Sequence, residues 1–419
     1  MAARRPRKVM IVNTSDSGGG AERVSMDLLD GFEALGTEAW LAVGAKHGNH
    51  PRVMPLYASP HLHYTRDHPL RRARRRARQR LDDRLGLEDF NHPYTGVIPD
   101  LAGSRPDVLL CNNLHGDFFD LRQLPQLSLK MPIVLRLADS WCFTGHCAVP
   151  GPCERWRTGC GRCPDLATPP AIRRDATRFN WQRKRWILAR SRVHLAVPSS
   201  WMLERARQSI LGPAIVDARV IPNGIDLATF SPEGEAAPGP RDGAARLVFA
   251  ANGGAANPHK DFATLRASLR RLEGPVELVS VGGESASENL GGGIRIRHEA
   301  ELSPGRLAAL YRSADLYVHA SAEESFSLTS AEALACGTPV VAASGGGIAE
   351  VVEHERTGLL VRPGDERSMS AALERLLDDS GLRGRMATEG AAERWRFDRD
   401  RMVRDMHDLC VEAVQGWRR

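Results

Sequence analysis

Short runs of aliphatic and β-branched residues recur along the chain and alternate with longer segments whose apolar positions lie three or four residues apart. The short runs predict buried strands, and the spaced positions predict helices that cover them. This alternation is typical of parallel sheets with helices on both faces. The predicted strands are 8–13, 39–43, 108–111, 133–137, 194–198, 247–251, 276–281, 316–320, 339–342 and 359–361.

These strands fall into two blocks of similar size, which predicts two α/β domains of the doubly wound, Rossmann-like type. The segment 219–243 separates the blocks and is rich in Pro, Gly and Ala, so we interpret it as the link between them. We therefore expect an N-terminal domain over 1–218 and a second domain over 219–398. The last helical segment, 399–419, is expected to pack back on the first domain.

The composition is that of a soluble globular protein, with 42% apolar and 26% charged residues in 419. No run approaches the roughly 18 apolar residues that span a bilayer. The basic start, Met1 to Lys8, leads into the first predicted strand without a cleavage site of small residues. We expect a cytoplasmic protein, with peripheral attachment to the inner face of the membrane as one refinement.

The net charge of +6 is unevenly distributed, because nine arginines lie between Arg66 and Arg84. Two interpretations stay open: a peripheral contact with an anionic membrane or another anionic partner, and a solvated helix in an arginine-rich protein. No aromatic residue interrupts this run, so we do not expect it to bind nucleic acid.

Three consecutive glycines, Gly18, Gly19 and Gly20, lie between the first predicted strand and a helical pattern. Glycine lets the backbone approach a phosphate closely, and the amides at a helix start attract an anion. The alternative is a tight turn without a ligand.

Two glutamates eight positions apart, Glu324 and Glu332, follow the predicted strand 316–320. We expect Glu324 in a loop and Glu332 at the start of a short helix that ends at Gly337. Carboxylates accept hydroxyl protons, and amides at a helix start neutralise a diphosphate. The pattern therefore predicts a site for a polyhydroxylated ligand that carries phosphate.

A lysine, Lys260, ends the glycine-rich loop 251–262 just before a predicted helix over 262–272. An ammonium at this position is a suitable counter-charge for a phosphate, and a plain surface lysine is the alternative. Gly282, directly after the strand 276–281, and Leu328 are further expected contacts of the donor.

Polar residues follow two strands of the first block. Asn112, Asn113 and His115 come after 108–111, and Asp139 and His146 come after 133–137. Ligands of doubly wound sheets bind outside the carboxyl ends of the strands. We therefore expect His115 and Asp139 among the catalytic groups, and Asn112, Asn113 and His146 on the acceptor side.

Four of the eight cysteines lie in a segment over 142–165, namely Cys147, Cys153, Cys160 and Cys163. Four thiolates can bind a structural zinc ion, which would tie a loop with little core of its own. Reduced thiols, or one redox pair, are the alternative. Neither interpretation makes these residues catalytic.

The segment from Ser321 to Val341 resembles the donor signature of retaining GT-B glycosyltransferases of family 4, the glycosyl transferases group 1, in which two glutamates flank seven residues. The resemblance implies that Glu324 contacts the transferred sugar and that Glu332 holds the ribose. It also implies that the amides of Phe326 and Ser327 lie near the sugar. Ser327, like Ser325, stands where glycine is common in the family.

The loop 251–262 resembles the phosphate loop of the same family, and Lys260 matches its lysine. Gly253 and Gly254 stand where many relatives carry an arginine. The first block, together with its cysteine segment, resembles a bacterial subgroup that builds surface polysaccharides. In that subgroup a histidine is usual where this chain has Asn112 and Ala138.

The resemblance implies a GT-B fold, with two Rossmann-like domains facing each other across a cleft. It implies transfer of a hexose-type sugar from a nucleoside-diphosphate sugar to a hydroxyl of a sugar or a lipid-linked acceptor, with retained anomeric configuration. We expect no required catalytic metal, because lysine, loop amides and helix dipoles can stabilise the leaving diphosphate. The alternatives are an epimerase or phosphorylase of the same fold, and a protein that binds zinc and nucleic acid.

Overall fold

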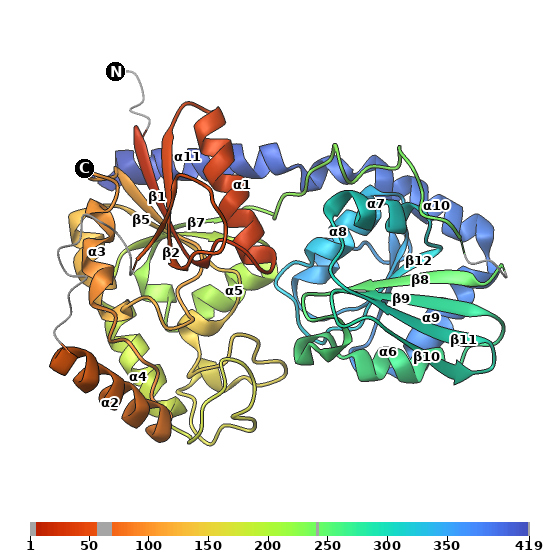
Figure 1. Cartoon of the computed structure of the whole chain (residues 1–419), viewed down its shortest axis with the longest axis horizontal. Coiled ribbons are helices and arrows are strands. Elements are labelled where there is room, and N and C mark those ends of the chain that lie inside the picture. The colour runs from red at the N-terminus through yellow and green to blue at the C-terminus, as the bar shows by residue number, and fades with distance from the viewer. Residues whose placement is uncertain (1–5, 57–68, 240–242, 418–419) are drawn as a thin grey trace. The chain divides into compact units, whose positions relative to one another are not determined.

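The computed structural model of the chain describes residues 6–56, 69–239 and 243–417 (Figure 1). They form two compact units. Unit 1 runs to Ile221 and resumes at Val403, and unit 2 spans Pro222–Met402. No helix in these described ranges combines the length and the apolar character that a membrane span requires.

Unit 1 is built on a parallel sheet with the strand order β3-β2-β1-β4-β5-β6-β7. All five strands predicted for the first block are present, and β3 and β7 extend the sheet at its two edges. The strands are β1 (Lys8–Ser15), β2 (Glu38–Ala45), β3 (Val53–Pro55), β4 (Val108–Cys111), β5 (Ile133–Arg136), β6 (Val193–Val197) and β7 (Ile215–Val220).

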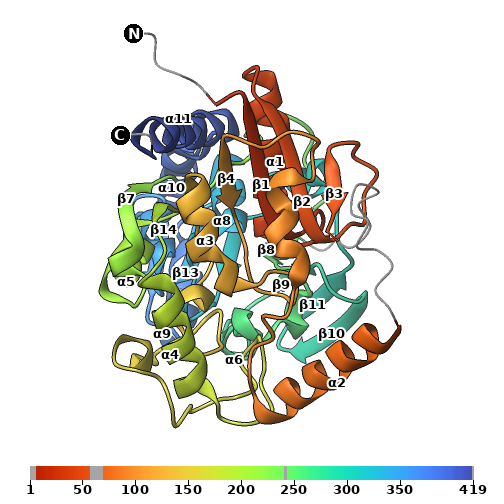
Figure 2. The same cartoon turned by 90° about the vertical axis from the view of Figure 1, so that its left-hand side faces the viewer.

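Helices cover both faces of this sheet (Figures 1 and 2). The helices of unit 1 are α1 (Gly20–Ala34), α2 (Pro69–Leu85), α3 (Leu124–Lys130), α4 (Thr177–Leu188), α5 (Ser200–Gln208) and α11 (Arg399–Trp417), of which α2 lies apart from the sheet. The chain's last helix, α11, packs beside α1. The ring of His407 meets Phe32 edge-on with centroids 5.6 Å apart, and its Nε2 lies 2.9 Å from the hydroxyl of Thr37. From Val403 onward, α11 is therefore part of unit 1.

Unit 2 contains a second seven-stranded sheet with the order β10-β11-β9-β8-β12-β13-β14. Only β10 runs antiparallel, in a hairpin with β11. The strands are β8 (Ala245–Ala250), β9 (Val276–Val281), β10 (Ala286–Gly291), β11 (Ile294–Glu299), β12 (Leu316–His319), β13 (Val340–Ala343) and β14 (Gly358–Val361). The five strands predicted for this block are all present.

Alternate residues of β8 point to opposite faces and so divide the core of unit 2 in two. Val248 and Ala250 pack with Tyr311, and Leu247 and Phe249 pack with Leu373. The helices of this unit are α6 (Phe262–Leu269), α7 (Pro304–Arg312), α8 (Leu328–Ala335), α9 (Glu366–Asp378) and α10 (Ser380–Ala392). Both faces of the sheet are thus buried, which explains the continuous apolar runs of its central strands.

Candidate functional site

The loops after β8 and β9 pack backbone against backbone in unit 2. Gly282 has a φ of 102°, and a Cβ atom built on it would lie 2.0 Å from the carbonyl oxygen of Ala251. A Cβ on Gly254 would lie 2.7 Å from the amide nitrogen of Gly283. Only glycine permits this approach, so these residues fix the course of the loop that ends at Lys260.

The ammonium of Lys260 contacts the carboxylate of Glu324, from the loop after β12. The side chains are only 20% and 18% exposed. The hydroxyl of Ser321 also donates to Glu324 Oε1, at 3.3 Å. The backbone of Glu324 is held in turn, because its carbonyl oxygen accepts the amide of Gly347 at 2.7 Å. Two residues predicted to bind the donor are therefore in direct contact.

The carboxylate of Glu324 is ionised at neutral pH. Burial alone would raise its pKa, but the charge of Lys260 holds the pKa far below its ordinary value. His319 is the last residue of β12, and its Nε2 lies 3.3 Å from Glu324 Oε1. Burial lowers the pKa of His319, so its ring is neutral. Sequence reasoning did not find His319, although a histidine at the end of a buried strand beside the predicted loop was the available signal.

The position of Glu332 differs from the prediction. Helix α8 begins at Leu328, directly after Ser327 in a left-handed conformation with φ 82°, so Glu332 lies inside the helix and not at its start. The apolar spacing from Leu328 through Ala331 to Ala335 sets this earlier start. Glu332 is fully buried, with Oε2 3.5 Å from the hydroxyl of Tyr311. Its contact with a ribose stays a prediction.

The other residues predicted around the sugar surround the start of α8. Phe326 is buried and packs against Phe397, with ring centroids 6.0 Å apart. The hydroxyl of Ser327 donates to Ser330 Oγ at 2.8 Å, and Leu328 is half-buried. Their part in donor binding is a prediction that these contacts leave untested.

The triple glycine of unit 1 forms the turn between β1 and α1. Gly19 precedes the helix, and its amide donates to the Glu22 carboxylate at 2.9 Å. The carboxylate of Glu22 thus accepts a hydrogen bond from one of the amides that were expected to face a phosphate. Donor binding by Gly18, Gly19 and Gly20 stays a prediction.

His115 and Asp139 form a close pair in unit 1, with Nε2 and Oδ2 2.8 Å apart. Asp139 Oδ1 also accepts the amide of Trp141 at 2.8 Å. Burial would lower the pKa of His115, but the charge and hydrogen bond of Asp139 outweigh it and raise the pKa. For Asp139, burial would raise the pKa and the pairing with His115 lowers it. The pair therefore holds a proton more tightly than a free histidine does.

His115 of this pair lines a cavity of about 400 Å³ whose lining residues all belong to unit 1. The lining also includes Asp117, Trp141, Arg76 and Asp89. Burial raises the pKa of Asp117. The cavity thus presents an imidazole, carboxylates and a guanidinium, which suits a polar ligand that both donates and accepts hydrogen bonds.

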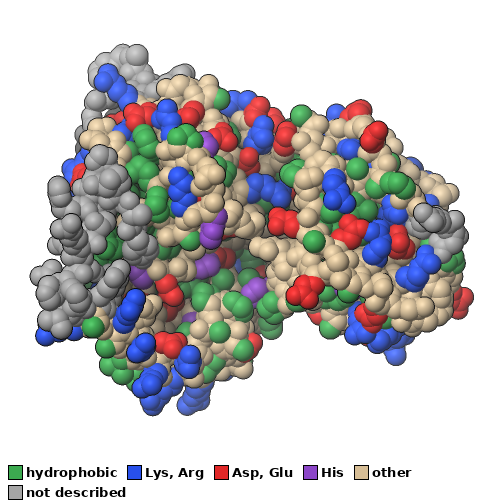
Figure 3. Space-filling view, in the orientation of Figure 1, with side chains coloured by type: hydrophobic (Ala, Val, Ile, Leu, Met, Phe, Trp, Pro, Cys, Tyr) green, Lys and Arg blue, Asp and Glu red, His purple; other side chains and the backbone are tan. Residues whose placement is uncertain are grey.

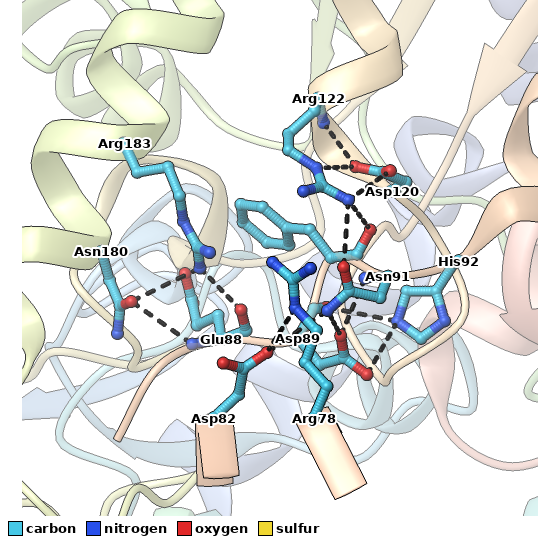
Figure 4. Close-up of polar contacts among 11 residues, drawn as sticks. Arg78, Asp82, Glu88, Asp89, Asn91, His92, Asp120, Arg122, Asn180 and Arg183 are labelled. Atoms are coloured by element: carbon cyan, nitrogen blue, oxygen red, sulfur yellow. Dashed lines mark hydrogen bonds and ion pairs between the residues drawn. The ribbon is translucent and has the colours of Figure 1, made fainter. Parts of the chain in front are cut away.

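Residues 86–89 line this cavity, and a polar network holds them and the following residues 90–92 in place (Figure 4). The amide of Glu88 donates to Asn180 Oδ1 of α4 at 3.3 Å, and Arg122 donates to the carbonyl oxygen of Phe90 at 3.0 Å. Asn91 donates to Asp89 Oδ1 at 2.8 Å. These contacts hold this part of the lining in place without a ligand.

None of the three predicted acceptor-side residues, Asn112, Asn113 and His146, is among the residues that line this cavity. Asn112 is 2% exposed and joins the sheet to α1, because its amide donates to the carbonyl oxygen of Ala21 at 2.7 Å. His146 is buried in the cysteine segment, with Nδ1 2.9 Å from the carbonyl oxygen of Pro170. Asn113 is half-buried and accepts the amide of His115 at 3.4 Å. Polar residues after a strand can serve packing as well as binding.

The four cysteines of the segment 142–165 line one small cavity together with His146. Burial raises the pKa of Cys147 to about 11 and that of Cys160 to about 12, so both are thiols at neutral pH. Across the described ranges, no three His, Cys, Asp or Glu side chains are grouped as a metal site would require. The structural zinc stays a prediction.

Comparisons with known proteins bear on both units. The family described as Glycosyl transferases group 1 matches residues 245–393, within unit 2. The D-inositol 3-phosphate glycosyltransferase of Xylanimonas cellulosilytica is 34% identical over 222 residues, 47% of this chain and 51% of that protein. The match thus spans about half of that relative. The putative colanic acid biosynthesis glycosyl transferase WcaC of Escherichia coli is 27% identical over 65% of this chain and 68% of its own length.

Solved structures match nearly the whole chain. Sucrose-phosphate synthase from Thermosynechococcus elongatus superposes with a TM-score of 0.66 at 18% identity, over 98% of this chain and 100% of that one. Anabaena HepE in complex with UDP-glucose gives 0.63 at 17% identity, over 98% and 99%. The two sheets and these similarities define a two-domain α/β protein with the GT-B fold. Within this fold, residues 245–393 are similar to the glycosyl transferases group 1.

Proposed function

We propose that this protein transfers a sugar from a nucleoside-diphosphate sugar to a hydroxyl group of an acceptor. The observation that carries the proposal is the contact between Lys260 and Glu324, in the loops after the central strands β8 and β12. Both residues lie inside the segment that matches the glycosyl transferases group 1. An ammonium neutralises a diphosphate, and an ionised carboxylate accepts protons from sugar hydroxyls. In this structure the two groups are paired with each other.

The proposed reaction begins when the diphosphate draws Lys260 away from Glu324. The bond between the anomeric carbon and the diphosphate oxygen then breaks, and Lys260 stabilises the charge that develops on the leaving group. The acceptor oxygen forms its bond to the anomeric carbon on the face that the diphosphate leaves, and the leaving phosphate takes the proton of that hydroxyl, so the anomeric configuration is retained. Glu324 holds the sugar hydroxyls during this step.

We propose the cavity beside His115 and Asp139 as the site of the acceptor. Its mixture of carboxylates with the guanidinium of Arg76 suits a hydroxyl-bearing sugar more than an apolar chain. WcaC is named for colanic acid biosynthesis, and this name supports an acceptor from cell-surface polysaccharide or glycoconjugate synthesis.

We also propose that unit 1 contacts anionic lipid through exposed arginines of α2 and exposed aromatic residues of α4. Arg66 lies outside the described residues, but Arg74, Arg76, Arg78, Arg80 and Arg84 of α2 are exposed. On α4, Phe179 and Trp186 are 53% and 57% exposed and, two helical turns apart, share one face. Basic side chains gather along the lower edge of this unit as it is drawn in Figure 3. Arginines and exposed aromatic rings are the side chains that suit a headgroup layer.

Vesicle flotation tests the lipid contact. We expect binding to vesicles rich in phosphatidylglycerol, weaker binding at high salt, and loss of binding when Phe179 and Trp186 are both changed to serine. Trp395→Ser is the matched control, because this tryptophan of unit 2 is 59% exposed. Equal binding of all variants would reject this surface.

The transfer itself is tested by nucleoside-diphosphate release from a panel of uridine, guanosine and adenosine diphosphate sugars, starting with UDP-glucose, with and without acceptor extracts. We expect release that depends on acceptor with at least one donor, and its loss in Glu324→Gln. Glu301→Gln, at an exposed glutamate of unit 2, is the control and should retain activity. An epimerised sugar nucleotide, or a sugar phosphate formed from inorganic phosphate, would point to the alternative enzymes. No reaction with any donor would reject the proposal.

A further inference from the structure

His319 is a buried imidazole whose two ring nitrogens both lack a hydrogen bond within the described part of the chain. Its side chain is 2% exposed and closes the carboxyl end of β12. A buried polar group without a partner is uncommon in folded proteins, because it has lost water without gaining a substitute. An unsatisfied imidazole beside the proposed donor site therefore requires a physical reason.

The reason lies in the crowding around one oxygen atom. Lys260, Ser321 and His319 all approach Oε1 of Glu324. Lys260 and Ser321 make hydrogen bonds to it, whereas Nε2 of His319 remains at 3.3 Å outside hydrogen-bond geometry. A carboxylate oxygen offers about two acceptor positions, so the third donor is excluded while both others are present.

We infer that His319 is a positioning residue for the donor sugar, and that it takes the place of Lys260 on Glu324 once a diphosphate binds the lysine. This inference rests on the proposed function. In the bound state the N–H of His319 donates to Oε1, and Glu324 keeps its charge and its orientation after the ammonium has moved. The carboxylate then remains able to accept hydrogen bonds from the sugar.

The alternative is that His319 only fills space in the core, and three substitutions separate the two roles. His319→Gln keeps a side-chain N–H at similar reach, His319→Asn keeps a polar amide that is too short, and His319→Leu keeps the volume without a donor. We expect kcat to fall about 10–100-fold in the Leu and Asn variants, the effect of losing a hydrogen bond to a charged group. The Gln variant should recover most of this loss.

The hydrogen bond from His319 is proposed to form when the diphosphate binds, so binding of the free diphosphate should weaken in the Leu and Asn variants and stay near the wild-type affinity in the Gln variant. Urea denaturation of each variant provides the control for folding. Wild-type turnover in the Leu variant would overturn the inference. So would equal losses of turnover and of diphosphate affinity in all three variants, because a Gln variant that recovers neither indicates a packing role.

A second measurement does not depend on turnover. In protein labelled with nitrogen-15 at histidine, addition of UDP should shift the ring resonances of His319, identified by their absence in His319→Gln, to values of a hydrogen-bonded neutral imidazole. Binding of UDP without such a shift would overturn the inference and leave the proposed function standing. A wild-type protein that binds none of the nucleoside diphosphates would instead reject the proposed function.

Discussion

From the contact between Lys260 and Glu324 we predict how a substitution of Lys260 changes the free energy of unfolding, and this prediction can be tested without a ligand. Replacing Lys260 by methionine leaves an ionised carboxylate that is 18% exposed without its cation. Removing one partner of a buried ion pair costs about 3–5 kcal/mol. Because the pair retains some contact with solvent and Ser321 still donates to Glu324, we expect about 2–3 kcal/mol here. For a unit the size of Pro222–Met402, this lowers the unfolding midpoint by about 4–12 °C.

The pH dependence of this loss has a definite sign. The pKa of Glu324 is lowered in the folded protein, so its pairing stabilises the fold above the ordinary carboxyl pKa of 4.5, and this stability is lost as the pH falls through the folded value. Without Lys260, burial is opposed only by weaker contacts, and the pKa of Glu324 rises. The difference between wild type and variant should therefore be largest near neutral pH and shrink toward pH 4.

Urea denaturation at several pH values measures these differences, with Lys130→Met as the control at an exposed lysine. A double-mutant cycle with Glu324→Gln should give a coupling free energy of about 2 kcal/mol at pH 7. A variant within about 0.5 kcal/mol of the wild type at every pH, the usual range for surface substitutions, would refute the reasoning.

Three further predictions concern other parts of the chain. Asp139→Asn should lower the pKa of His115, which NMR titration measures, and an unchanged titration would contradict the pairing. In the wild type the pairing stabilises the fold below the ordinary histidine pKa, and this stability is lost as the pH rises through the folded value. Gly282→Ala should destabilise unit 2 by about 1–3 kcal/mol, because the new Cβ meets the carbonyl oxygen of Ala251; a wild-type melting curve would be inconsistent with that approach. For the cysteines, the four-thiolate interpretation predicts about one zinc per chain in protein purified without chelator, whereas four freely titrating thiols without metal would support the reduced form.

Much of the fold could be predicted because its central strands are buried on both faces. All ten predicted strands are present. The four that were missed are short or polar and lie at or near sheet edges. For example, β3 has three residues and β10 carries Ser287, Glu288 and Asn289 in its sequence. Edge strands need not be apolar on both faces, so hydrophobic periodicity does not reveal them.

The candidate site could be predicted in part for a similar reason. Lys260 and Glu324 follow the neighbouring parallel strands β8 and β12, whose carboxyl ends meet at one edge of the sheet, and both were predicted. The burial of Glu332 and the role of Asn112 depend on how a helix docks on its sheet, which a local pattern does not specify. The crowding of His319 around Glu324 depends on three side chains from different loops, and only the assembled structure shows it.

Calorimetric titration of a nucleoside diphosphate and its sugar conjugate, UDP and UDP-glucose first, into wild type, Lys260→Met and Glu324→Gln tests the central claim most directly. We predict that Lys260→Met weakens binding of both ligands by about 10–100-fold, because a charge-assisted hydrogen bond to phosphate is lost. Glu324→Gln should weaken only the sugar conjugate. Unchanged affinity of both variants for both ligands would contradict the account.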